Sequence, residues 1–160
     1  MAILKILKDD DPTLRRVSRE VEEITPRIIR LLDDMRDTLH KENGCGLAAV
    51  QVGVLRRVVL VEVEEGKLYE MINPVITERS EETQEEVEGC LSLPGKWGLT
   101  KRPKTVTVEA TDREGKRYSV TGSDLLARAI CHECDHLDGI LYSDKALRML
   151  TKQEIKDCLG

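Results

Sequence analysis

The fold is decided by residues 125–142, and within them by the run Cys131-His132-Glu133-Cys134-Asp135-His136. Residues in a helix advance by about 100° each, so His132 and His136 lie one turn apart on the same face. Two imidazoles in that arrangement can bind one divalent metal, and Glu133 beside them is placed to act on a water at the metal. The run therefore predicts a helix that carries a catalytic metal, and it leaves the third ligand to be found.

The zinc proteases that share this spacing need a third ligand that the chain lacks. In one class the motif continues as HExxHxxGxxH; here Gly139 matches, but Tyr142 occupies the position of the third histidine. Another class uses a downstream glutamate, and the only one after His136 is Glu154, in an expected closing helix. The one spare histidine, His40, falls on the last turn of another expected helix, where a solvated cation interacts well with the helix dipole. Neither protease class is favoured.

Cys131 and Cys134 form a C-x-x-C pair, which is typical of redox pairs and of half-sites for structural zinc. A four-cysteine site needs a second closely spaced pair, however. The other cysteines stand far apart in the chain; they are Cys45, Cys90 and Cys158. We therefore expect Cys134 to face the core as a small apolar residue.

Cys90 is the strongest candidate for the third ligand. It lies between Gly89 and a Pro94-Gly95 turn, a setting that can present a thiolate. One cysteine and two histidines leave open the fourth position that a catalytic metal needs for water. Taken alone, Cys90 would be interpreted as a buried structural thiol. Beside the histidine motif, ligation is favoured.

A second unusual stretch is the glycine-rich segment 44–53, which has the sequence Gly-Cys-Gly-Leu-Ala-Ala-Val-Gln-Val-Gly. Small residues allow the backbone to come close to a neighbouring strand or to a ligand. From the residues alone, a tight structural crossing and a binding loop both stay open. In the second case Gln51 is a hydrogen-bond donor.

Length and composition limit the class of protein. The chain has 160 residues, no Phe and 2% aromatic residues, so we expect one domain over residues 1–160 with a core of Val, Ile and Leu. The net charge of −5 disfavours a broad nucleic-acid surface. The first residues form no apolar run typical of a signal peptide, and no stretch reaches the roughly 18 apolar residues of a membrane span. Five cysteines, an odd number, favour a reducing cytoplasm.

Three helices are predicted from their capping residues. Thr25 as N-cap, with proline after it, begins an amphipathic helix that Asn43 and the following glycine end. Ser123 is expected to cap the helix that carries the histidines. Thr151 and Glu154 have the form of a capping box before a short final helix.

Strands are predicted between these helices. The β-branched run at 56–63 reads as a strand buried at its centre, and 68–77 as another, interrupted at Asn73. Alternating apolar residues predict a hairpin over 105–120. The acidic residues 78–88 are interpreted as a solvated face or loop.

Three stretches, taken together, resemble the motifs of the bacterial-type peptide deformylases, the enzymes that remove the formyl group from the initiator methionine of new chains. Residues 44–51 look like the motif GxGLAAxQ, residues 88–92 like EGCLS, and residues 132–136 like HExDH. Their order and spacing fit, and the likeness covers nearly the whole chain. It is closest to the class with short loops, in which Cys-Leu-Ser runs almost directly into Pro-Gly.

The resemblance implies a catalytic centre. Its metal ligands would be Cys90, His132 and His136. Glu133 would be the general acid and base, taking a proton from a water whose pKa the metal lowers toward about 7. The backbone N–H of Leu91 and the side-chain amide of Gln51 would stabilise the oxyanion.

The resemblance also implies a peptide-binding surface. The backbone of Gly46 and its neighbours would pair with the substrate as an added strand, and Gly89 would also contact the substrate. The methionine pocket would be lined by Cys45, Leu125 and Ala129. Asp135 and Arg102 match family positions and would orient the ligands from behind. The fold implied is α+β, with small antiparallel or mixed sheets packed around the central histidine helix, an N-terminal helix and a short C-terminal helix.

Cofactor and partners follow from the same resemblance. One divalent metal is expected per chain, Fe²⁺ in the cell, with Zn²⁺, Ni²⁺ or Co²⁺ as replacements in purified protein. The expected substrates are N-formylmethionyl nascent peptides in the cytoplasm, with the ribosome near the exit tunnel as a further partner. We expect a monomer or weak dimer that binds neither membrane nor specific nucleic-acid sequences. The alternatives are a metal-dependent protease or amidase for another acyl group, and a catalytically silent metal-binding homologue.

The chain departs from the family pattern at three places. Cys131 stands where glutamine is usual. This places a second thiol near the metal helix, where oxidation of the thiol or competition for the metal becomes a possibility. Val50 stands where proline or threonine is common. The segment after the histidine helix is short, which puts ribosome docking through a basic C-terminal helix in doubt.

Overall fold

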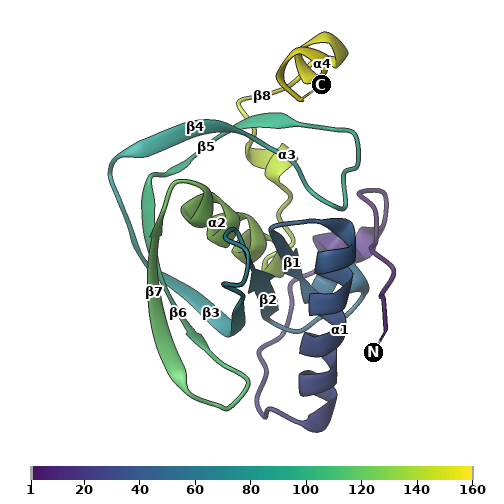
Figure 1. Cartoon of the computed structure of the whole chain (residues 1–160), viewed down its shortest axis with the longest axis vertical. Coiled ribbons are helices and arrows are strands. Elements are labelled where there is room, and N and C mark those ends of the chain that lie inside the picture. The colour runs from purple at the N-terminus through teal and green to yellow at the C-terminus, as the bar shows by residue number, and fades with distance from the viewer. Residues whose placement is uncertain (1, 160) are drawn as a thin grey trace.

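Helix α2 (Leu125–Leu137) lies at the centre of the molecule, enclosed by two sheets, as the computed structural model shows for residues 2–159 (Figure 1). A larger sheet covers one side of α2 and a smaller one passes over the other. Helix α1 (Pro26–Glu42) packs on the far face of the larger sheet. The predicted arrangement of antiparallel sheets around a central histidine helix is confirmed.

The two sheets are built from eight strands in the described residues. The larger has the order β1-β2-β3-β6-β7 and the smaller β4-β5-β8, and neighbouring strands are antiparallel. The strands are β1 (Gly46–Ala48), β2 (Val58–Val61), β3 (Tyr69–Arg79), β4 (Thr83–Glu88), β5 (Gly98–Pro103), β6 (Thr105–Thr111), β7 (Arg117–Ser123) and β8 (Arg148–Met149). The remaining elements are two 3₁₀ turns and two short helices: η1 (Pro12–Arg15), η2 (Ala49–Val52), α3 (Tyr142–Lys145) and α4 (Lys152–Leu159).

The position of strand β2 between two cores explains why its sequence is apolar without alternation. Val59 and Val61 belong to the core between the larger sheet and α2, whereas Val58 and Leu60 belong to the core under α1. All four side chains are fully buried because both faces of the strand are covered. A strand buried on both faces reads as a continuous apolar run, as the sequence predicted for the centre of 56–63.

Helix α1 begins and ends where its capping residues predicted. The Thr25 side chain accepts from the backbone N–H of Ile28, and Asn43 ends the helix with φ 54°, in the left-handed region. Its apolar stripe includes Leu32 and Met35, both fully buried. The helix therefore serves the fold by covering the larger sheet.

The interruption predicted at Asn73 is a bulge and not the end of a strand. Asn73 has φ 51°, and the register of β3 against β6 shifts between Ile72 and Val75. Its amide exchanges two 2.8 Å hydrogen bonds with the backbone of Val21, which fixes the N-terminal segment against the sheet. Asparagine tolerates the left-handed conformation better than most residues, so the strand continues beyond it.

The prediction that Ser123 caps α2 is wrong. Strand β7 continues through Ser123, whose hydroxyl lies 2.7 Å from that of Thr105 on β6. Asp124 is the N-cap residue, with φ 57°, and its side chain makes no capping bond. Instead it forms an ion pair with Lys104. The chain passes from sheet to helix in one residue, which leaves no room for a serine cap.

The acidic segment 78–88 is partly a strand, which the sequence did not predict. Strand β4 is the edge of the smaller sheet and pairs only with β5. Glu85 and Glu86 are exposed, as expected, and charge on an edge strand discourages pairing with other chains. Glu88, at the end of the strand, is buried.

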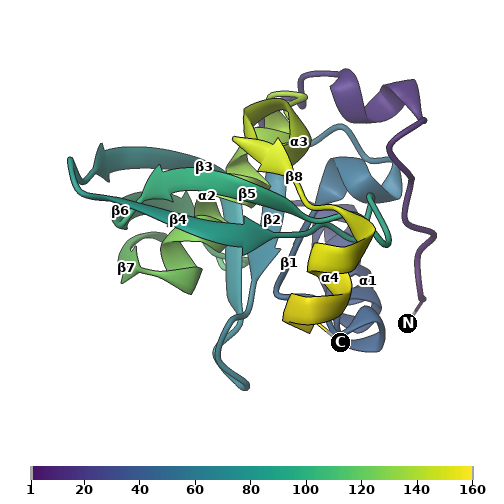
Figure 2. The same ribbon diagram turned by 90° about the horizontal axis from the view of Figure 1, so that it is seen from above.

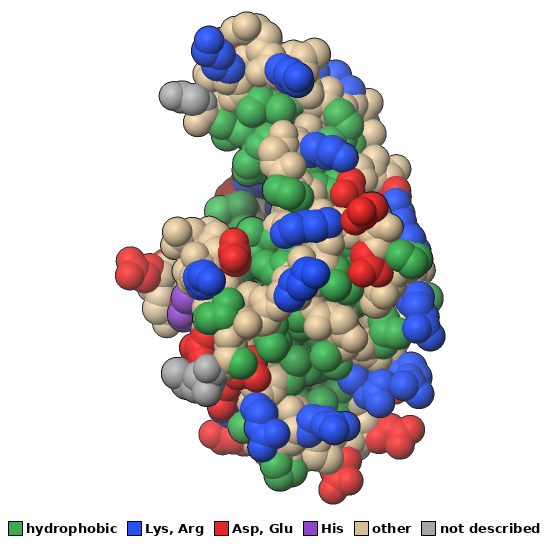
Figure 3. All heavy atoms as spheres, turned by 90° about the vertical axis from the view of Figure 1, so that its right-hand side faces the viewer, with side chains coloured by type: hydrophobic (Ala, Val, Ile, Leu, Met, Phe, Trp, Pro, Cys, Tyr) green, Lys and Arg blue, Asp and Glu red, His purple; other side chains and the backbone are tan. Residues whose placement is uncertain are grey.

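The C-terminal elements α3, β8 and α4 follow one another along the chain, and β8 pairs with the edge of β5 before α4 begins (Figure 2). The predicted capping box is confirmed: the Glu154 N–H donates to the Thr151 hydroxyl at 3.1 Å, and the Thr151 N–H donates to the Glu154 carboxylate at 3.0 Å. Helix α4 has no buried residue. In the face shown in Figure 3, the part of the molecule that contains α4 is set off by a notch, and both signs of charge are scattered over the surface. No helix within residues 2–159 is both long and apolar enough to cross a membrane.

Candidate metal centre and cleft

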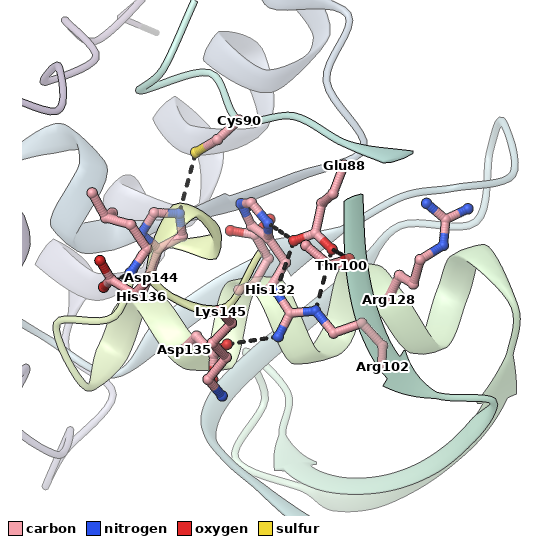
Figure 4. Close-up of polar contacts among 12 residues, drawn as sticks. Glu88, Cys90, Thr100, Arg102, Arg128, His132, Asp135, His136, Asp144 and Lys145 are labelled. Carbon is pink, nitrogen blue, oxygen red and sulfur yellow. Dashed lines mark hydrogen bonds and ion pairs between the residues drawn. The ribbon is translucent and has the colours of Figure 1, made fainter. Parts of the chain in front are cut away.

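The structure brings the three predicted ligands together. His132 and His136 project from α2 toward Cys90, which follows the end of β4 (Figure 4). One ligand atom from each of the three residues lies within 4.8 Å of the other two. The Cys90 Sγ is 3.4 Å from the His136 Nε2. Within the described residues this is the one group of three such side chains close enough to share an ion.

The orientation of the two imidazoles fits a metal. His132 uses its Nδ1 on the Glu88 carboxylate, at 2.5 Å, so its Nε2 is left for an ion. A carboxylate behind a histidine fixes the ring and raises its basicity as a ligand. His136 turns its Nε2 toward Cys90. A thiolate with two imidazole nitrogens suits Fe²⁺, Zn²⁺, Ni²⁺ and Co²⁺, so the residues fit a divalent transition metal.

Glu88 is the main site residue that sequence reasoning missed. It is 7% exposed and connects His132 to the Arg102 guanidinium, which donates to it at 2.7 and 3.2 Å. Burial raises the pKa of Glu88, but the hydrogen bonds to His132 and Arg102 outweigh this and lower the pKa to about 2. Glu88 therefore stays ionised. The sequence signal for Glu88 was its position next to Gly89 and Cys90. The acidic residues before it led us to interpret it as part of a solvated segment.

Arg102 and Asp135 lie behind the ligands, as the resemblance implied. Arg102 is 3% exposed and also donates to the Asp135 carboxylate at 2.7 Å. Asp135 in turn pairs with Lys145 at 3.2 Å. Despite burial, these acids raise the pKa of Arg102. A line of alternating charge thus runs from Lys145 to His132 and holds the imidazole in position (Figure 4).

Glu133 lies beside the three ligands and is almost fully buried. One carboxylate oxygen is 4.0 Å from the His132 Nε2, and the other, Oε1, is buried without a hydrogen-bond partner among the described residues. Burial, opposed in part by the charge on His132, raises the pKa of Glu133 to about 7. A carboxylate with that pKa can take up and release a proton near neutral pH.

Gly46 leaves the space that Glu133 occupies. A Cβ at position 46 would overlap the Glu133 carboxylate. The tight crossing is confirmed, because β1 lies close to α2. The same segment lines the cleft, and its role as a binding loop stays a prediction.

Gln51 points its amide N–H toward Cys90, one of the three candidate ligands. Its Oε1 accepts from the backbone N–H of Ala48 at 2.9 Å, which fixes the amide orientation. The Nε2 then donates to the Ser92 hydroxyl at 3.1 Å and lies 3.5 Å from the Cys90 Sγ. Ser92, fully buried, is a second residue that sequence reasoning missed. The amide is preorganised as a donor beside the site.

A cleft of about 520 Å³ opens onto this group. It contains all of the predicted substrate-binding residues and also Leu91; they are Cys45, Gly46, Gly89, Leu125 and Ala129. Arg128 and Trp97 line it as well and were not predicted. Another cavity, of about 540 Å³, lies by Cys134 and Asp135 and contains none of the three ligands. The candidate catalytic residues therefore lie in the first cleft.

The remaining cysteines and the third histidine lie outside the ligand group. Cys131 lies on α2 and is buried in the core, and burial raises the pKa of its thiol. Cys134 packs against the same core and is half-buried. Within residues 2–159, Cys131 is therefore not among the residues close enough together to share an ion. His40 pairs with Glu62 at 2.6 Å at the end of α1.

Comparisons with known proteins agree with the geometry. A family model described as "Polypeptide deformylase" matches residues 3–152. A peptide deformylase of Acetivibrio thermocellus is 53% identical over 156 residues, covering 98% of this chain and 91% of the relative. The crystal structure of the Ehrlichia chaffeensis peptide deformylase in complex with actinonin superposes with a TM-score of 0.89 at 35% identity, covering 100% of both chains. That of the Thermotoga maritima enzyme has a TM-score of 0.88 at 31% identity, covering 91% of this chain and 99% of that one.

Proposed function

Because the chain belongs to the polypeptide deformylase family, we propose that Cys90, His132 and His136 hold its catalytic metal and that this metal is Fe²⁺ in the cell. The protein is a metal-dependent hydrolase that removes the formyl group from N-terminal formylmethionine of newly made chains. The observation that carries the site assignment is the group of three donors beside the buried Glu133 in one cleft. Zn²⁺, Ni²⁺ or Co²⁺ would occupy the same donors in purified protein.

The substrate peptide would lie between Gly46 and Gly89 as an added strand. Both glycines line the cleft, and β1 is an edge strand of the larger sheet, so its backbone has hydrogen-bonding groups to offer. The methionine side chain would enter between Cys45, Leu125 and Ala129, which present short or aliphatic surface. This arrangement supports recognition of methionine by apolar burial and of the main chain by hydrogen bonds.

Glu133 would move the proton. A divalent ion in this site supplies Lewis acidity, which lowers the pKa of a water molecule and polarises a carbonyl group. The Glu133 carboxylate, whose pKa is about 7, would accept a proton from water and deliver it to the amine that leaves. Its unpartnered Oε1 supports this role, since no neighbouring group competes for that oxygen among the described residues.

Gln51 and Leu91 would stabilise the charge that develops on the formyl oxygen. The Gln51 Nε2 is held near Cys90 by the bonds of the same amide to Ala48 and Ser92. The backbone N–H of Leu91 directly follows the cysteine ligand. Donors fixed in advance stabilise a transition state more than donors that must reorient, and one such donor is typically worth about 10²–10³-fold in rate.

The cellular setting is part of the proposal. The substrates are formylated nascent peptides, which supports action in the cytoplasm, close to the ribosomal exit tunnel. We propose a monomer or weak dimer.

Replacing Gly46 by alanine is expected to lower kcat by about 10²-fold, because the new Cβ would displace the Glu133 carboxylate and small misplacements of a catalytic group have effects of this size. The double variant Gly46→Ala/Glu133→Gln should be no slower than Glu133→Gln alone, since both changes act through one side chain. Formate release by the four proteins, at measured metal content, checks this. Additive effects would contradict the steric role of Gly46.

The assignment of the metal site is tested with Cys90→Ser. The hydroxyl is a much poorer ligand than a thiolate. Losing a residue that only orients a ligand typically lowers metal affinity by roughly 10- to 100-fold, so losing the ligand itself should lower it at least as much. Titration with Co²⁺ or Ni²⁺ under anaerobic conditions measures this. The matched control is Cys158→Ser, in α4 and exposed, which should bind metal normally.

Activity itself is tested with formyl-Met peptides and anaerobically prepared, Fe²⁺- or Ni²⁺-loaded protein. Formate should be released from formyl-Met-Ala, and acetyl-Met-Ala should release no acetate. A folded, fully loaded protein that releases no formate would overturn the proposed chemistry.

A further inference from the structure

Tyr142, the first residue of α3, lies against the metal centre, although the proposed chemistry does not use it. It occupies the position at which the spacing HExxHxxGxxH places a third histidine ligand. Gly139, with φ 75°, turns the chain between α2 and α3. The Tyr142 side chain is 1% exposed, and its ring centroid is 5.9 Å from that of His132, with the two ring planes 24° apart. The ring is therefore stacked on an imidazole that is a candidate ligand.

The stacked ring supplies a restraint that the hydrogen bond to His132 does not. The Glu88 carboxylate holds the His132 Nδ1 at 2.5 Å, which fixes one nitrogen but leaves the imidazole free to tilt about the line of that bond. Tyr142 covers one face of the imidazole, and the His136 ring packs at 68° to it with the centroids 5.0 Å apart. A tilt of His132 would have to displace one of these rings. The direction of its Nε2 is therefore set by packing as well as by hydrogen bonding.

The Tyr142 ring is itself held in place. Its hydroxyl donates to the Lys96 carbonyl at 3.1 Å. A Cβ at Gly98 would lie 3.1 Å from the Tyr142 Cε2, so the glycine at the start of β5 leaves the room that the ring uses. Because its hydroxyl is engaged with a backbone carbonyl, we interpret Tyr142 as a support for a ligand and not as a ligand.

The same hydroxyl connects the ring to the segment that carries the cysteine ligand. The Leu93 N–H donates to the Cys90 carbonyl at 3.0 Å, and the Lys96 N–H donates to the Leu93 carbonyl at 3.3 Å. The Lys96 carbonyl then accepts from Tyr142. A series of three hydrogen bonds therefore runs from Cys90 to the side chain that is stacked on His132. Tyr142 thus connects the two parts of the site, the helix with the imidazoles and the segment with the thiol.

We propose that Tyr142 is a positioning residue of the metal centre: its ring fixes the plane of the His132 imidazole, and its hydroxyl fixes the segment of Cys90 relative to that ring. This role deepens the proposed function and rests on the metal site assigned there. A residue that only fills the core would affect stability alone. A residue that positions a ligand also affects how tightly the metal is held and in what geometry.

Anaerobic titration of the metal-free proteins with Co²⁺ tests this, under conditions in which circular dichroism shows each protein folded. Tyr142→Leu lacks the flat ring, so its Kd should rise by roughly 10- to 100-fold, and the visible absorption of bound Co²⁺ should shift because the ligand geometry changes. Tyr142→Phe keeps the ring and loses one hydrogen bond, so its Kd should rise by no more than roughly 2- to 10-fold. If Tyr142→Leu does not fold, Tyr142→Met, whose flexible side chain fills irregular gaps, takes its place with the same expected result.

The matched control is Met71→Ala, on β3 and fully buried in the same core as Tyr142. It should unfold at a lower urea concentration than the wild type, because it leaves a cavity. Its Kd for Co²⁺ and the absorption of the bound ion should be those of the wild type. The control therefore separates loss of packing from loss of ligand position.

Turnover gives a second readout. Tyr142 does not line the cleft that contains the predicted substrate-binding residues, so Tyr142→Leu should lower kcat per bound metal ion and leave KM for formyl-Met-Ala nearly unchanged. A Tyr142→Leu variant with the wild-type Kd and absorption, or a Tyr142→Phe variant that binds Co²⁺ as weakly as Tyr142→Leu, would overturn the proposal. Failure of the wild type to release formate would instead contradict the proposed function, and the Co²⁺ titration would still decide the role of Tyr142.

Discussion

Replacing Glu133 by glutamine is expected to lower kcat by about 10²–10⁴-fold, the usual contribution of a general acid and base. The amide has nearly the same shape as the carboxylate, so the contact at Gly46 is kept. It cannot accept the proton from water or return one to the leaving amine. Metal content should not change, because Glu133 is not in the group of three ligands.

The same variant has a predicted effect on stability that separates this role from a structural one. The wild-type Oε1 is buried without a partner among residues 2–159, and burial of a charged form costs free energy. Glu133→Gln should therefore unfold at the same or a higher urea concentration than the wild type. Formate release and urea denaturation measure the two effects. Glu85→Gln, exposed on β4, is the control. Normal turnover in Glu133→Gln would contradict the proposed proton transfer.

Replacing Arg102 by methionine is expected to lower the free energy of unfolding by about 3–5 kcal/mol, the cost of leaving a buried charge without its partner. Glu88 would keep its negative charge in a buried position without Arg102. Asp135 would lose its ion pair with Arg102 and keep the one with Lys145. Metal affinity should also fall, since Glu88 would no longer be held against the His132 Nδ1.

A double-mutant cycle tests this interpretation. Arg102→Met/Glu88→Gln removes both charges and should recover part of the stability lost in Arg102→Met alone. Urea denaturation of the metal-free proteins measures the cycle without a contribution from metal binding. Lys101→Met, exposed on the same strand, should change stability by no more than about 0.5 kcal/mol. If the single and double variants were equally unstable, the ion pair would not be the source of the effect.

The sequence predicted the parts of the site that depend on local geometry. His132 and His136 share a face because of helical spacing, and the capping residues Thr25, Asn43 and Thr151 define helix ends within a few residues of themselves. Cys90 was found by elimination among ligands. These inferences need no knowledge of how distant segments pack.

The parts that were missed depend on pairing between distant segments. Glu88 is buried because β4 pairs with β5 and lies against a helix residue 44 positions later, and an acidic run gives no local sign of this. Ser92 likewise becomes a partner of Gln51 across 41 positions. The wrong assignment of Ser123 has the opposite cause: serine is a good cap, but β7 extended one residue further and took its hydroxyl.

The position of α2 between two separate sheets has a consequence for how metal is lost. The histidines stand on α2, which packs on the larger sheet, whereas Cys90 and Glu88 arrive with the smaller sheet. Undocking of that three-stranded sheet would separate the thiolate from both imidazoles while the larger sheet stays folded. If metal leaves through such an opening, amides in β4 and β5 should exchange faster than those in β2 and β3, which native-state hydrogen exchange measures. Retention of the ion would then depend on how firmly the smaller sheet packs on α2 as well as on the three ligands.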